Sequence, residues 1–116
     1  MKIVIPDELY ELIWKIDARI DIDNQLTQLA EEAAELAQAA LKHRRALQTA
    51  RLDKDVSPTT KALNDSYDSL TEECSDVMLA ILVTTRHLIS NDIMLNKARR
   101  WLDRLKRYRD EDDENE

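Results

Sequence analysis

The feature that most constrains the fold of this chain is the complete absence of glycine from its 116 residues. At an average usage of about 7%, roughly eight glycines would be expected. Tight hairpin turns and left-handed helix caps depend on glycine, as do the phosphate-binding loops of P-loop, Rossmann and kinase proteins. Only two prolines interrupt the backbone. The sequence therefore predicts an all-α domain, in which side chains and metal, and not a backbone loop, would have to hold any phosphate.

Composition and the first residues predict a cytoplasmic protein. Hydrophobic residues make up 43% of the chain and charged residues 35%, a balance typical of amphipathic helices and not of a disordered chain. The longest apolar run, residues 77–83, is far shorter than a membrane span, so no membrane partner is expected. Residues 1–5 are followed at once by a proline and two acids, which does not fit a signal peptide. The single cysteine, Cys74, lies in an apolar stretch and is expected to be buried and unreactive.

The net charge of −7 is unevenly distributed along the sequence. Residues 110–116 hold six of the 24 acids and no base, which leaves 18 acids against 17 bases in the other 109 residues. We expect residues 1–109 to form one domain and residues 110–116 to be a disordered acidic tail. Residues 96–109 hold seven bases and one acid, but the near-neutral remainder and the adjoining tail argue against a nucleic-acid partner.

Hydrophobic spacing predicts four helices. They are expected at residues 6–22, 23–48, 65–89 and from residue 91 onward. Residues 49–65 are polar, contain Ser57-Pro58 and lack a sustained period, so they are expected to be a linker or an insertion. In the third helix the run 77–83 is apolar on every side and is expected at the centre of the assembly. The predicted architecture is an antiparallel four-helix bundle-like domain, completed by oligomerisation because so short a chain leaves much of its surface uncovered.

An acidic stripe borders the apolar side of the second expected helix. That side consists of Leu26, Leu29, Ala30, Ala33, Leu36, Ala37, Ala40 and Leu47, and its many alanines permit a neighbouring helix to approach closely. Glu32 and Glu35 are three residues apart, so they lie about 60° apart around the helix and about one turn apart along it. Gln25 and Gln28 extend the stripe toward the N-terminus, whereas Glu31 points further toward solvent.

The third expected helix repeats this arrangement with Glu73 and Asp76. The next positions on their stripe, Ala80 and Val83, are apolar, so these acids border the most buried part of the helix. Unpaired carboxylates there are costly and two such pairs repel each other, and a divalent cation would remove both problems. Oxygen ligands in this number suit Mg²⁺, with Mn²⁺ as a substitute. The alternative is that all four acids are ordinary surface residues paired with lysine or arginine, and spacing alone leaves both interpretations open.

Two other catalytic classes fit the sequence poorly. A di-iron carboxylate bundle needs Glu-x-x-His motifs, but the residues three positions before His43 and His87 are Ala40 and Thr84. Both histidines are expected to be partly exposed helix residues. No serine or cysteine stands out as a nucleophile with a base at helical spacing.

Two acidic motifs together give the chain a family resemblance. The segment QLTQLAEEAAELAQAALKHRR, residues 25–45, contains Glu31, Glu32 and Glu35 as EExxE. The later segment LTEECSDVMLAILV, residues 70–83, contains Glu73 and Asp76 as ExxD. In this order and context they resemble the MazG-like members of the all-α nucleoside triphosphate pyrophosphohydrolase superfamily, over roughly residues 20–104. Either motif alone would be weak, whereas the two together are fairly specific.

The resemblance implies an enzyme that cleaves between the α- and β-phosphates of an NTP or dNTP with Mg²⁺, giving the monophosphate and pyrophosphate, as in a house-cleaning role. It also implies a homodimer or homotetramer with sites built from more than one chain. By motif match, Glu32, Glu35, Glu73 and Asp76 would bind metal, and Glu31 would position or activate the attacking water. The residues that would bind substrate are the glutamine candidates Gln25 and Gln28 and the downstream segment Asn96, Lys97, Arg99, Arg100 and Trp101.

The chain departs from the family pattern in three places. The 37 residues between Glu35 and Glu73 form a longer interval than compact members have. Arg100 stands where relatives often carry a small residue, and Asp92 stands where a lysine is often found. These departures weaken the phosphate assignments more than the metal assignments. The competing hypothesis is a non-catalytic helical oligomerisation or interaction module that retains the fold, and the complete set of five carboxylates argues against it.

Overall fold

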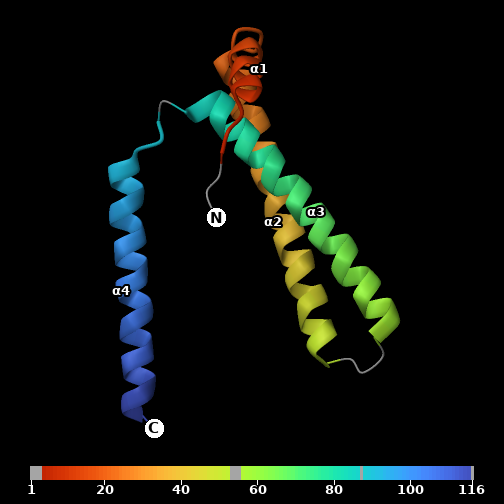
Figure 1. The fold of residues 1–116 in the computed structure, drawn as a ribbon, viewed down its shortest axis with the longest axis vertical. Coiled ribbons are helices and arrows are strands. Elements are labelled where there is room, and N and C mark those ends of the chain that lie inside the picture. Colours follow the sequence, from red (N-terminus) through yellow and green to blue (C-terminus); the bar gives the residue numbers. More distant parts are fainter. Residues whose placement is uncertain (1–3, 53–55, 87, 116) are drawn as a thin grey trace. The chain divides into compact units, whose positions relative to one another are not determined.

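The computed structural model describes residues 4–52, 56–86 and 88–115, with the side chains of 4–52, 60–86 and 88–109. It contains helices α1 (Asp7–Asp17), α2 (Ile22–Leu52), α3 (Val56–Thr85) and α4 (Asn91–Asn115) (Figure 1). All regular structure in the described residues is helical, which confirms the all-α prediction. The chain divides into two compact units, Met1–Arg86 and His87–Glu116, so α4 belongs to a unit of its own. None of the described helices combines the length and the apolar character that crossing a membrane requires.

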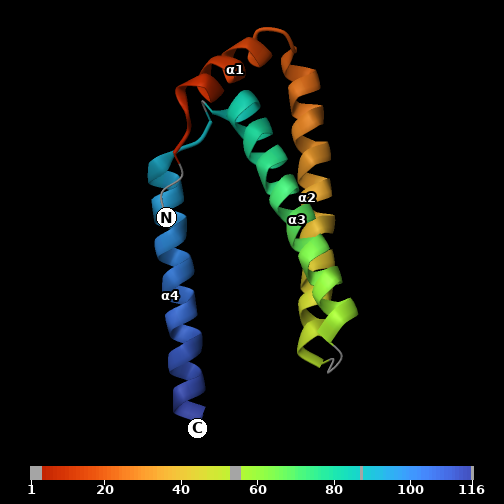
Figure 2. The same cartoon turned by 45° about the vertical axis from the view of Figure 1, so that its right-hand side comes forward.

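In the first unit, α2 and α3 run antiparallel and lie side by side (Figures 1 and 2). Positions that are buried or half-buried recur along each helix every three or four residues, as in the contact line of a coiled coil. We call these positions the seam: Gln25, Leu29, Glu32, Leu36, Ala39, His43, Ala46 and Ala50 on α2, and Leu63, Ser66, Leu70, Glu73, Val77, Ala80 and Thr84 on α3. The seam is therefore a mixture of apolar and polar residues, and two of its members are glutamates.

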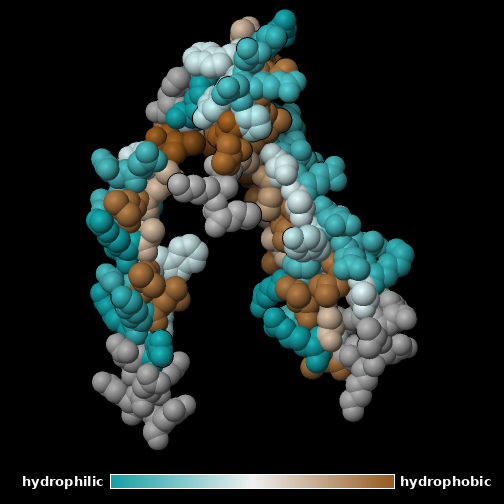
Figure 3. Space-filling model, in the orientation of Figure 1, coloured by the Kyte–Doolittle hydropathy of each residue, from teal (hydrophilic) through white to brown (hydrophobic). Residues whose placement is uncertain are grey.

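α1 packs against α3 and supplies the most buried side chain of the first unit, Ile13. Ala80 and Val83 of α3 are the other buried apolar residues among those described. Many larger apolar side chains are exposed in both units (Figure 3). The run 77–83, which is apolar on every side and expected at the centre of the assembly, leaves Met78 45% exposed. Within a single chain, α2 and α1 cover only part of the circumference of α3.

The first helix is shorter than its hydrophobic spacing predicts. It ends at Asp17 and not near residue 22, because the Nε2 group of Gln25 donates to Oδ1 of Asp17 at 2.8 Å and to the carbonyl of Ile20 at 2.7 Å. These bonds hold a turn between α1 and α2. At the other end, Pro6 precedes the helix with extended backbone (φ −61°, ψ 149°) and does not form part of its first turn.

The expected linker at residues 49–65 is helical throughout its described residues. α2 continues to Leu52 and α3 begins at Val56. The segment has no glycine, and Pro58 falls in the first turn of α3, where a backbone N–H has no intrahelical acceptor to lose. Polar composition alone does not end a helix, so the prediction of a linker is corrected.

α4 begins at Asn91, as predicted, and Oγ of Ser90 accepts a hydrogen bond from the N–H of Ile93 at 3.3 Å. Its described side chains, at residues 91–109, are all exposed. The helix continues to Asn115, so the backbone of residues 110–115 is helical where a disordered tail was expected. No glycine or proline lies in this segment to stop the helix.

Candidate metal site

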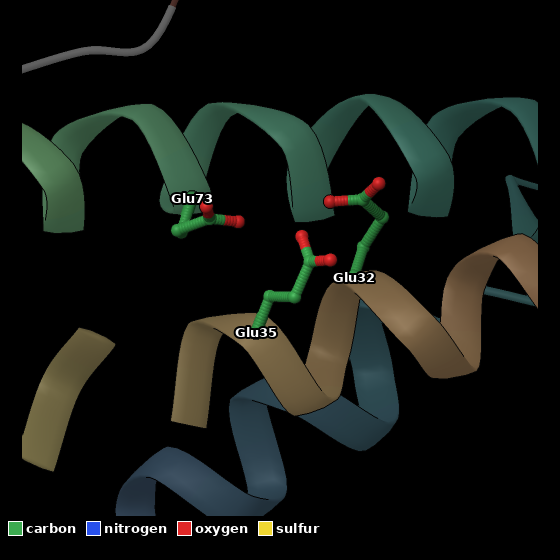
Figure 4. Close-up of side chains that lie close together, drawn as sticks. All are labelled: Glu32, Glu35 and Glu73. Carbon is green, nitrogen blue, oxygen red and sulfur yellow. The ribbon is translucent and has the colours of Figure 1, made fainter. Parts of the chain in front are cut away.

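Three of the predicted metal ligands converge between the two long helices. Glu32 and Glu35 on α2 and Glu73 on α3 point toward one another (Figure 4). One carboxylate oxygen of each lies within 4.8 Å of the others. We call these three residues the carboxylate cluster. Glu32 and Glu73 lie in the seam and are half-buried, whereas Glu35 is about one turn beyond Glu32 and exposed.

The cluster contains carboxylate oxygens that are buried without a donor. Oε2 of Glu32 and Oε2 of Glu73 are inaccessible to solvent and accept no hydrogen bond from the described residues. The other oxygen of Glu32 accepts a hydrogen bond from Nε2 of Gln28 at 2.7 Å. Buried oxygens of this kind carry a desolvation cost that a bound cation would offset.

Burial and mutual repulsion both disfavour ionisation of these glutamates. Burial raises the pKa of Glu32 above its usual range, the carboxylates of Glu35 and Asp76 raise it further, and the bond from Gln28 lowers it. Burial likewise raises the pKa of Glu73, with further increases caused chiefly by Glu35 and Asp76. Among the described residues, no lysine or arginine forms an ion pair with the cluster. The structure thus gives no support to the alternative of acids paired with surface cations.

Asp76 lies beside the cluster but not within it. Its charge contributes to the raised pKa of Glu32 and of Glu73, yet its oxygens are not part of the group within 4.8 Å. With Gln28 and Glu32 it instead lines a cavity of about 170 Å³. The rest of the lining is mainly apolar: Ile16, Ile20, Gln25, Leu79, Ala80, Val83 and Thr84.

The two glutamines and the third acid of the EExxE motif have different surroundings. Gln28 touches the cluster through Glu32. Gln25 is only 4% exposed, and its amide nitrogen donates hydrogen bonds to Asp17 and Ile20, so it stabilises the turn between α1 and α2. Glu31 is exposed and outside the cluster, as its position on the helix predicts.

The predicted substrate-binding segment lies on α4, in the second unit. Its five members, Asn96, Lys97, Arg99, Arg100 and Trp101, are all exposed. Within α4, a shallow groove is lined by Lys97, Arg100 and Trp101 with Met94, Ala98, Arg104 and Arg107, whereas Asn96 and Arg99 do not line it. Since the two units are described separately, the part of these residues in binding substrate stays a prediction.

Two basic residues near the cluster were not predicted. Lys42 and Arg45 of α2 line an open groove together with Glu35 and Glu73. A signal was present in the sequence, because Lys42 follows Glu35 by seven residues and two turns of helix bring it back to the same side.

The remaining candidates for nucleophilic chemistry have structural explanations. Nδ1 of His43 and Oγ of Ser66 lie 2.9 Å apart across the seam, and the hydroxyl of Ser66 also donates to the carbonyl of Leu63. His43 is half-buried, as expected, and His87 lies outside the described residues. Cys74 is exposed, which corrects the expectation of burial, because it is one position beyond the seam residue Glu73.

The chain was compared with known proteins. No protein-family model matches it, and it matches no curated protein and no solved structure. The resemblance of the two acidic motifs to MazG-like proteins therefore stays an expectation.

Proposed function

We propose that this chain is a Mg²⁺-dependent nucleoside triphosphate pyrophosphohydrolase that cleaves an NTP or dNTP between its α- and β-phosphates. The observation that supports the proposal is the carboxylate cluster, in which three acids from two helices meet and two buried oxygens lack a donor. Glutamates in a helix seam reduce the stability of the pair of helices, so their presence is better explained by binding than by packing.

The residues of the cluster fit a hard divalent cation, because all their donors are carboxylate oxygens. Glu32, Glu35 and Glu73 would hold the ion, with Asp76 adjoining. When bound, Mg²⁺ supplies charge neutralisation for phosphate oxygens and lowers the pKa of a coordinated water. Gln28 holds one oxygen of Glu32 in place, and Glu31, on the exposed side of α2, would orient and deprotonate the attacking water.

The cavity beside the cluster offers a place for the nucleoside. Its apolar lining would accept the face of a base, while Gln28 and Thr84 in the same lining provide polar atoms for hydrogen bonds. The phosphates would then extend from the cavity across the carboxylate cluster. An apolar cavity followed by carboxylates that bind a cation matches a molecule with an aromatic base at one end and anionic phosphates at the other.

We further propose that the chain works as a homo-oligomer. α2 and α3 each carry an exposed stripe roughly 100° around from the seam. We call the part of these stripes without charge the uncharged face: Leu26, Ala30, Ala33, Ala37 and Ala40 on α2, and Tyr67, Thr71, Cys74 and Met78 on α3. Arg44 occupies the next position of the α2 stripe and borders this face. Both stripes are displaced from the seam in the same sense, which in an antiparallel pair puts them on one side, opposite Glu35 and Asp76.

A second copy of the chain is the occupant that this face fits best. A face without charge is complementary to itself, since no like charges meet across a two-fold axis. The alanines of α2 permit close approach, and Tyr67 and Met78 supply apolar area. Two pairs of helices packed through this face would form a four-helix bundle from two chains and leave both carboxylate clusters accessible.

The enzymatic proposal is tested by offering the purified chain and Mg²⁺ a panel of NTPs and dNTPs and following release of pyrophosphate and monophosphate. We expect turnover of at least one nucleotide, its loss in Glu32→Gln, and its retention in Glu11→Gln, which changes an exposed acid of α1. No turnover of any nucleotide, with metal bound normally, would contradict the proposal and favour the alternative of a non-catalytic oligomerisation module.

A further inference from the structure

A groove next to the carboxylate cluster contains two cations that the proposed metal site does not use. Lys42 and Arg45 line it from α2, together with Glu35, Gln38, Ala39 and Leu41 of the same helix and Ser69 and Glu73 of α3. The groove therefore leads from two of the clustered acids to two basic side chains.

Helix geometry places these cations in line with the acids. Lys42 is seven residues beyond Glu35, so it lies about 10 Å further along α2 and on nearly the same side. Arg45 follows about one turn later, and Ser69 of α3 lies about one turn before Glu73. The distance between Glu35 and Lys42 is longer than the single helical turn that separates the partners of an ion pair on one helix. It therefore leaves room for a ligand between the acids and the bases.

No described acid neutralises either cation. Among the described residues, Lys42 and Arg45 form no ion pair, whereas Lys61 bonds to Asp65 at 2.7 Å. No acid occupies a position three or four residues away from either of them on α2. They are instead three residues from each other, and like charges at this spacing destabilise a helix slightly. A bound anion would relieve this repulsion.

We infer that Lys42 and Arg45 bind the pyrophosphate portion of the substrate, that is, its β- and γ-phosphates. The inference rests on the proposed function, since it takes the α-phosphate to lie at the carboxylate cluster. The forked guanidinium of Arg45 suits two phosphate oxygens, and the flexible Lys42 adds a point charge. In a chain without glycine, side chains and not a backbone loop have to bind the phosphates. The family resemblance assigns phosphate binding to Lys97, Arg99 and Arg100 of α4 instead. Experiment can distinguish that assignment from the one to Lys42 and Arg45.

The test measures binding of inorganic pyrophosphate to the full chain by calorimetry in the presence of Mg²⁺. We expect Lys42→Ala and Arg45→Ala each to weaken binding by about tenfold or more, which corresponds to the loss of one charge-assisted interaction. Arg44→Ala is the matched control, because Arg44 is an exposed base of the same helix that does not line the groove. Mg²⁺ binding without pyrophosphate and the thermal unfolding midpoint should be unchanged in all three variants.

Unchanged pyrophosphate affinity in both groove variants would overturn the inference, and so would a loss confined to Lys97→Ala or Arg100→Ala. Failure of the proposed function has a different signature. If pyrophosphate binding depends on Lys42 and Arg45 but no nucleotide is hydrolysed, the anion site is supported and the proposed enzymatic function is contradicted. If nucleotides are hydrolysed and the groove variants bind pyrophosphate normally, the proposed enzymatic function is supported and the anion site is contradicted.

Discussion

Nη2 of Arg86 donates a hydrogen bond to Oδ2 of Asp17 at 2.8 Å and so joins the end of α3 to the end of α1. Only 16% of the Arg86 side chain and 33% of the Asp17 side chain are exposed. The guanidinium also lies 4.2 Å from the centre of the Trp14 ring, and its Nη1 donates to the carbonyl of Val83. Since Asp17 accepts a further bond from Gln25 of α2, all three helices of the first unit meet at this ion pair.

We expect Arg86→Ala to lower the free energy of unfolding by about 1–3 kcal/mol, because a half-buried carboxylate loses its cation and Trp14 loses its cation–π contact. Urea unfolding near neutral pH measures the change. Lys61→Ala is the control, because the Lys61–Asp65 pair is 80% and 63% exposed and should contribute less than about 0.5 kcal/mol. Equal losses in the two variants would show that the Arg86 pair stabilises the fold no more than a surface pair does.

Local spacing predicted the helical class, but not the end of α1, the helical structure of residues 49–52 and 56–65, or what the helices pack against. The absence of glycine and the hydrophobic period predicted the all-α class and the start of α4 at Asn91. The turn after Asp17 depends on Gln25, and the Arg86–Asp17 pair joins residues 69 positions apart, so neither is visible in a local pattern. The second half of α3 was expected in the centre because its composition is apolar all round. Within one chain its surroundings cover only part of it.

For the carboxylates, too, local spacing predicted which residues share a side of one helix but not which residues meet between helices. Spacing predicted that Glu32 and Glu35 share one side of a helix, and that Glu73 and Asp76 share one side of another. Which acids meet depends on the register of α2 against α3, which no single helix encodes. The structure brings Glu73 into the cluster and leaves Asp76 beside it. The seven-residue spacing puts Lys42 on the same side of α2 as Glu35, but only the structure shows that both residues line one groove.

The raised pKa values of Glu32 and Glu73 predict how stability changes with pH when no metal is bound. A carboxyl with a higher pKa in the folded chain than in the unfolded chain holds its proton more tightly when folded. Its stabilising contribution is therefore complete below the ordinary glutamate pKa of about 4.3 and is lost as pH rises through the folded value. In EDTA, we expect the free energy of unfolding to fall above about pH 4.3 more steeply than in Glu32→Gln or Glu73→Gln.

Denaturant unfolding across this pH range provides the measurement. Near neutral pH without metal, both variants should be more stable than the unsubstituted chain, and saturating Mg²⁺ should reverse the order because the variants bind it less tightly. Glu11→Gln should follow the unsubstituted profile, since Glu11 is exposed and far from the cluster in sequence. Parallel profiles for all four proteins would show that the seam glutamates do not titrate abnormally.

Substitution of Glu31 tests the proposed catalytic role separately from the proposed metal binding. It is exposed and outside the carboxylate cluster, so Glu31→Gln should bind Mn²⁺ within about twofold of the unsubstituted affinity. If Glu31 accepts the proton of the attacking water, the same variant should lose about 10²–10⁴-fold in kcat. Glu35→Gln should instead weaken metal binding and kcat together. Calorimetric Mn²⁺ titration and steady-state kinetics distinguish the two patterns, and a Glu31→Gln variant with full kcat would refute the role given by the family resemblance.

The uncharged face is tested by placing a charge on it. Met78→Lys should convert the proposed oligomer to a monomer of 13.5 kDa in size-exclusion chromatography with light scattering, because an unpaired charge in a desolvated interface costs several kcal/mol, on the order of 3–5. Asp68→Lys changes an exposed residue of α3 outside this face and should leave the oligomer intact.

Cys74 provides a second readout, because it is the only cysteine of the chain and lies on the uncharged face. Maleimide should label it slowly in the oligomer and rapidly in the Met78→Lys monomer, since a partner chain would exclude the reagent. An unsubstituted chain that is monomeric at all concentrations and labels rapidly would contradict the interface. A monomer that labels slowly would instead show that another part of the same chain covers the face, and the second copy would not be needed to complete the bundle.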